Sequence, residues 1–72
     1  MENKRDRFIR IAENRTNKII DMLRLLGNCA NKSNYEYSEE DITKIFSSLE
    51  KELKTTKVKF VSSGTKSDKF KL

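Results

Sequence analysis

Two groups of residues have side chains that enzymes use, and neither group is complete. Cys29 is the only cysteine, and the sequence has no histidine to serve as its base. A nucleophile needs such a base and a third, orienting group. The carboxylates of Glu39, Glu40 and Asp41 could act in acid–base chemistry or bind a cation, but acids in the first turn of a helix already complement the helix dipole. We therefore expect no enzyme activity, no catalytic residue, no cofactor and no metal site.

The remaining candidate site is a basic surface. Helical periodicity places several arginine and asparagine side chains on one face of residues 5–26. Arginine binds phosphate through two parallel hydrogen bonds, and asparagine can read adenine. The alternative is a solvated face, which is the usual role of charged residues along a helix, with Asp21 compensating part of its charge. The candidates for binding a nucleic acid or another partner are Arg7, Arg10, Asn14, Arg24, Lys66, Lys69 and Lys71.

The placement of charge agrees with that surface. The formal net charge is +5. Residues 1–27 have three more basic than acidic side chains, residues 61–72 have two more, and the segments between them are balanced. This distribution suits an anionic partner, although it also serves solubility.

The basic face belongs to a predicted helix over about residues 5–26, whose other side is apolar. The stripe contains Phe8, Ala12, Ile19, Leu23 and Leu26, and further apolar residues widen it on both sides. A face this wide usually contacts two or more neighbours, which indicates self-association. The candidates for the oligomer interface are Ile9, Ile20 and Leu23. Gly27 follows as the predicted C′ residue.

Arg15 departs from this pattern. On the helical wheel it lies between Phe8 and Met22, inside the apolar face. A charged group there must pair or extend to water. One interpretation is a structural pair with an acid or carbonyl of the loop, near Glu36. The other places Arg15 at a subunit interface or ligand pocket.

A second helix is predicted over about residues 39–58. Ser38 as N-cap and Asp41 at N3 resemble a capping box, and Tyr37 with Ile42 would form a hydrophobic staple. The apolar residues that follow have the spacing of a heptad seam and form a narrow stripe. They are Ile42, Phe46, Leu49, Leu53 and Phe60, with Ile45 beside them.

These elements predict an all-α fold. Residues 1–60 would form an antiparallel two-helix hairpin with a loop at 27–38, and residues 61–72 a basic, flexible tail. A chain of 72 residues has a small core, so it often needs a disulfide, a metal or a partner subunit. With one cysteine and no histidine, self-association remains, and paired hairpins would give a homo-oligomeric helical bundle, a four-helix bundle for a dimer.

Known DNA-binding layouts match poorly. A helix-turn-helix has a turn of about three or four residues, and this connection is longer. A ribbon-helix-helix would need a strand at residues 7–11, which lack strict alternation; it stays open as an alternative. No secretory signal or membrane span is visible, so we expect a cytoplasmic protein that does not contact membranes.

The sequence resembles a group of small bacterial helical proteins associated with plasmids, phages and other mobile elements. The resemblance lies in Arg7-Phe8, residues 12–15, Gly27-Asn28, residues 33–41 and Ile45-Phe46. It covers residues 7–60. The group has no agreed activity, so the resemblance implies a bacterial, mobile-element setting and no site residue.

Two functional hypotheses follow. The first is a small oligomeric interaction protein that binds another protein, as an accessory or regulatory factor of a mobile element. The second is a nucleic-acid-binding accessory or regulatory protein that uses the basic face and the lysine-rich tail. Salt-sensitive DNA binding would distinguish them.

Overall fold

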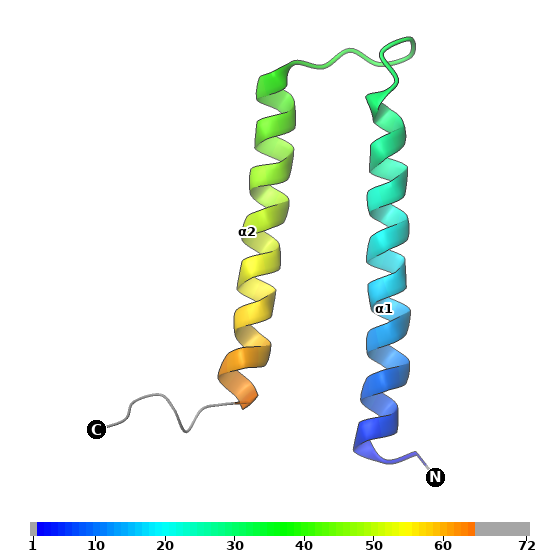
Figure 1. Cartoon of the computed structure of the whole chain (residues 1–72), viewed down its shortest axis with the longest axis vertical. Helices are drawn as coiled ribbons and strands as arrows, with labels where there is room; N and C mark the ends of the chain where they lie inside the picture. The colour runs from blue at the N-terminus through cyan, green and yellow to red at the C-terminus, as the bar shows by residue number, and fades with distance from the viewer. Residues whose placement is uncertain (1, 65–72) are drawn as a thin grey trace, which may run out of the picture. The chain divides into compact units, whose positions relative to one another are not determined.

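The computed structural model describes the backbone of residues 2–64 and the side chains of residues 2–62. Within this range all regular secondary structure is helical, with α1 at Lys4–Gly27, a short 3-10 helix η1 at Asn28–Ala30, and α2 at Glu39–Gly64 (Figure 1). No strand occurs in the described residues, so the expected all-α class is confirmed. The first unit of the chain ends at Glu36 and the second begins at Tyr37.

Asn3 determines where α1 begins. Its backbone is extended, and its side-chain Oδ1 accepts a hydrogen bond of 2.7 Å from the N–H of Asp6. Its carbonyl accepts the N–H of Arg7 at 3.0 Å, the first bond of the helical ladder. Asparagine is a strong N-cap because its side chain satisfies a backbone donor that the helix leaves unpaired. The helix accordingly starts at Lys4, slightly earlier than expected.

The C-terminus of α1 differs from the prediction. Gly27 is the last residue of α1 and has right-handed helical angles, φ −61° and ψ −26°. No glycine in the described residues has positive φ, so Gly27 is not a left-handed C′ residue. The chain instead tightens into η1, and the N–H of Asn28 donates to the carbonyls of Leu25 and Leu26. Such 3-10 turns are a common alternative at helix ends.

Asn31 organises the connection after η1. Its side-chain Oδ1 accepts the N–H of Ser33 at 2.9 Å. Its carbonyl accepts the N–H of Asn34 at 3.1 Å and of Tyr35 at 3.0 Å. These are the bonds of an Asx turn followed by a tight backbone turn. The asparagine-rich segment therefore has defined local structure, which composition alone did not predict.

The start of α2 agrees with the sequence pattern, and its end does not. Ser38 and Asp41 form the predicted capping box. The helix then continues to Gly64, beyond the expected end near residue 58. Residues 61–64 therefore belong to α2 and not to a tail. The sequence has no proline, and Gly64 is the first glycine after Gly27, so no helix-breaking residue intervenes. The rest of the predicted tail lies outside the described residues.

The described chain has no buried side chain. Among residues 2–62, half-buried side chains are those of Glu2, Ile11, Ala12, Leu26, Tyr37 and Leu49, and the others are exposed. The exposed side chains include large apolar residues of α1 and of α2. Neither helix combines the length and apolar content needed to cross a lipid bilayer over its described residues.

Candidate interaction surfaces

The predicted interface residues of α1 are open to solvent. Ile9, Ile20 and Leu23 are 37%, 39% and 45% exposed. Their spacing along α1 gives them a common side of the helix. Isolated exposed apolar residues are ordinary on protein surfaces, but a continuous apolar side is typical of an interaction surface. We call these three residues and their apolar neighbours Phe8 and Ile19 the α1 apolar face.

The stripe of α2 is exposed in the same way. Leu53 is 65% exposed and Phe60 is 62% exposed, although each lies in the heptad seam. Leu49, near the middle of the stripe, is half-buried. The seam residues Ile42, Phe46, Leu49, Leu53 and Phe60 are called the α2 stripe below. Its geometry suits packing against another helix, since heptad spacing keeps the apolar side chains facing one neighbour.

Arg15 is also exposed in the single chain. No ion pair of the described residues includes it, and it is not paired with Glu36. Its position on the apolar side of α1 means that packing there would bring a cation into the interface. The alternative, that Arg15 lies at a subunit interface or ligand pocket, stays a prediction.

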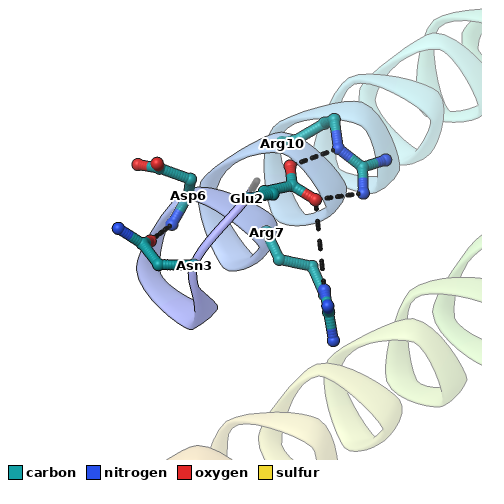
Figure 2. A network of polar contacts seen from close by, with 5 residues as sticks. All are labelled: Glu2, Asn3, Asp6, Arg7 and Arg10. Atoms are coloured by element: carbon teal, nitrogen blue, oxygen red, sulfur yellow. Dashed lines mark hydrogen bonds and ion pairs between the residues drawn. The ribbon is translucent and has the colours of Figure 1, made fainter.

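At the N-terminus of α1, two arginines of the basic face converge on one carboxylate (Figure 2). Arg10 donates from Nε to Oε2 of Glu2 at 2.7 Å and from Nη2 to Oε1 at 2.9 Å. Nε of Arg7 lies 4.0 Å from Oε1 of the same carboxylate. This arrangement, the Glu2 clamp, is the two-pronged geometry that arginine uses for planar anions.

The clamp changes the protonation of its members. The hydrogen bonds from Arg10 lower the pKa of the Glu2 carboxyl from its ordinary value of 4.5, with a smaller opposing effect of desolvation. The same bonds raise the pKa of the Arg10 guanidinium. Both groups are therefore charged at neutral pH. The Glu2 carboxylate therefore neutralises part of the positive charge that the sequence predicts for this face.

Farther along α1, Arg24 forms a long ion pair. Its Nη1 lies 4.0 Å from Oδ1 of Asp21, and its side chain is 79% exposed. Asn14 is exposed between the clamp and Arg24. The other predicted contacts, Lys66, Lys69 and Lys71, lie outside the described residues. The described part of the basic surface thus consists of Arg7, Arg10, Asn14 and Arg24, which we call the basic face.

The residues considered for catalysis have structural surroundings. Asp41 belongs to the capping box, and Glu40 lies 3.9 Å from Nζ of Lys44 one turn later. The thiol of Cys29 is free and exposed in η1. In the described part of the chain, no cluster of three or more histidine, cysteine or acidic residues could hold a metal ion.

Glu2 is the functional candidate that sequence reasoning missed. It precedes the N-cap, and eight positions separate it from Arg10. Helical neighbours are three or four positions apart, so periodicity gave no signal for this pair. The signal that exists is an acidic residue directly before a strong N-cap with arginines in the following turns.

Comparison with known proteins adds no relative from which a site could be transferred. No protein-family model, no curated protein and no solved structure matches this chain.

Proposed function

We propose that this chain is a non-enzymatic, homo-oligomeric helical protein whose assembled surface binds another macromolecule. In this proposal the two helices pack as an antiparallel hairpin, and hairpins associate into a bundle. The observation that carries it is the exposure of apolar side chains along both helices, with no buried side chain among residues 2–62.

The widths of the two apolar surfaces support association between copies. The α2 stripe is narrow and offers one seam, whereas the α1 apolar face extends from Phe8 and Ile19 around to Ile9 and Ile20. One narrow seam covers only part of a wide face. Hairpin formation would therefore leave apolar surface on α1, and a second copy supplies a surface of matching chemistry.

Sedimentation velocity at micromolar concentration tests the assembly. The expected mass is at least twice that of the single chain. Leu23→Glu places a charge in the α1 apolar face and should shift the protein toward monomer. Asn17→Glu, the matched control, adds the same charge on the polar side of α1 and should leave the mass unchanged. A monodisperse, thermally stable monomer for the unmodified chain would contradict the proposal.

The biological setting is part of the proposal. The resemblance to small proteins of plasmids, phages and other mobile elements favours an accessory or regulatory role in a bacterial cytoplasm. A protein partner is the first candidate, because apolar helical surfaces recognise other helices and apolar grooves.

One observation favours a second candidate function, nucleic-acid binding. Arg10 already holds an anion through two parallel hydrogen bonds, with Arg7 beside it. The same fork binds backbone phosphate. The basic face would then follow a nucleic-acid backbone, and the dependence of affinity on salt is its test.

A further inference from the structure

We propose that Arg7 and Arg10 form a binding site for a backbone phosphate of a nucleic acid and that Glu2 competes for this site from within the chain. The inference rests on the second candidate function, nucleic-acid binding. It adds the residue that limits binding at this end of the basic face.

The first argument is geometric. Figure 2 shows the carboxylate of Glu2 held by the guanidinium of Arg10 at 2.7 and 2.9 Å, with Nε of Arg7 4.0 Å from one of its oxygens. The planar guanidinium fork matches the paired oxygens of a carboxylate and of a phosphate alike. The Glu2 carboxylate thus occupies the position that a phosphate would take between these two arginines.

The second argument is that Glu2 can leave without loss of helix structure. Glu2 lies before the N-cap, whereas α1 is started by the bonds from Asp6 and Arg7 to Asn3. The side chains of Arg7 and Arg10 are 62% and 63% exposed, so an incoming anion can reach them. Exposed ion pairs contribute little to stability, so exchanging the carboxylate for a phosphate costs little.

The third argument selects a polyanion over a free phosphate. Arg24 continues the basic face about 21 Å beyond Arg10 along α1, at about 1.5 Å per residue. One small anion would occupy only the clamp. A nucleic-acid backbone repeats its charge and can contact both ends of the basic face.

The test measures binding of a fluorescein-labelled DNA duplex, and of its labelled single strand, by fluorescence anisotropy at about 50 mM salt. Glu2→Gln keeps the size of the side chain and removes the competing charge. We expect roughly two- to fivefold tighter binding than the unmodified chain shows. Glu52→Gln makes the same change in net charge on α2 and should have a much smaller effect. Circular dichroism verifies that all variants keep their helix content.

A second pair of variants tests the role of Arg10. Arg10→Lys keeps the charge and removes the two-pronged bond. In the Arg10→Lys variant, Glu2→Gln should increase the DNA affinity by a smaller factor than in the unmodified chain. An equal increase in DNA affinity with Arg10 and with Lys at this position would mean that Glu2 acts only through the net charge of the chain. That result would overturn competition at the clamp.

The other outcomes separate the two proposals. Equal DNA affinity for the unmodified chain and Glu2→Gln would overturn the role of Glu2 and leave nucleic-acid binding in place. If neither the unmodified chain nor Glu2→Gln binds either DNA probe, both the role of Glu2 and nucleic-acid binding are overturned. Binding of inorganic phosphate without binding of DNA would show a small-anion site and reject the nucleic-acid assignment.

Discussion

Ser38 and Asp41 hydrogen-bond each other twice across the first turn of α2. The N–H of Asp41 donates to Oγ of Ser38 at 3.1 Å, and the N–H of Ser38 donates to Oδ2 of Asp41 at 2.8 Å. Each bond satisfies a backbone donor that the start of a helix leaves without a helical partner. Aspartate, although shorter than the usual glutamate, therefore closes this capping box.

Loss of the cap should destabilise the protein. Ser38→Ala removes the acceptor for the Asp41 N–H, and we expect a cost of about 0.5–2 kcal/mol in the free energy of unfolding. Tyr37→Ala should add to this cost by removing the predicted hydrophobic staple with Ile42. Urea unfolding followed by circular dichroism, at one fixed protein concentration, measures both. Ser48→Ala, an exposed position inside α2, should be neutral or slightly stabilising. Equal stability of Ser38→Ala and the unmodified chain would contradict the role of the cap.

Substitution of Arg15 tests whether the apolar side of α1 is packed in the proposed assembly. Arg15→Met keeps an apolar stem of similar length without the charge, and it should be neutral or stabilising if assembly brings Arg15 into an interface. Arg15→Ala loses the packing of the stem as well and should be clearly less stable. Arg24→Met, on the basic face, should change little. Thermal melts of the three variants decide the point, and negligible effects of both Arg15 substitutions would mean that the side chain is solvated.

The Glu2 clamp predicts a specific dependence on pH. Because Arg10 lowers the pKa of the Glu2 carboxyl below 4.5, the clamp is fully formed above that ordinary value. Its contribution is lost as the pH falls through the lowered pKa of the folded chain. NMR titration of the Glu2 side-chain carboxyl should give a midpoint below 4.5. Arg10→Gln should return the midpoint toward that value. An unshifted midpoint in the unmodified chain would show that the clamp is not populated in solution.

The proposed nucleic-acid binding should weaken steeply with salt, because each neutralised phosphate releases counterions. The double variant Arg7→Ala, Arg10→Ala should bind less tightly and flatten the salt slope by roughly one unit per lost contact. Lys51→Ala with Lys54→Ala removes the same charge from α2 and is the matched control. Deletion of residues 65–72, which leaves α2 intact to Gly64, should also reduce affinity through its three lysines. Anisotropy titrations over a salt series measure the slope, and equal slopes for all variants would argue against contacts at the basic face.

Local sequence patterns predicted the two helices. A helix boundary could be predicted accurately only where the pattern was compatible with a single way to begin or end the helix. The capping residues Ser38 and Asp41 form a short-range motif, so the start of α2 could be predicted to the residue. Gly27 allowed two helix endings, the left-handed C′ and the 3-10 turn, and composition does not choose between them. After Phe60 the apolar spacing fades, but loss of amphipathicity does not end a helix, and α2 continues to Gly64.

The candidate sites divide in the same way. Helical periodicity could place Arg7, Arg10, Asn14 and Arg24 on one face, because that placement depends only on residues per turn. It could not reveal that Arg7 and Arg10 share Glu2. That contact depends on the extended backbone of Asn3, which sets the position of Glu2 relative to α1. Nor could helical periodicity reveal whether Arg15 becomes buried, because burial depends on contacts between elements, which no local pattern encodes.

The exposed thiol of Cys29 gives each copy of the chain one site for chemical labelling. It is the only cysteine in the sequence and lies in η1, directly after α1. A thiol-reactive dye can therefore be attached once per copy without any substitution. In a mixture of labelled and unlabelled chains, depolarisation by energy transfer between identical dyes would rise with the number of copies within reach. The sequence thus supplies one labelling position per copy, with which the exchange of subunits in the proposed oligomer can be followed in real time.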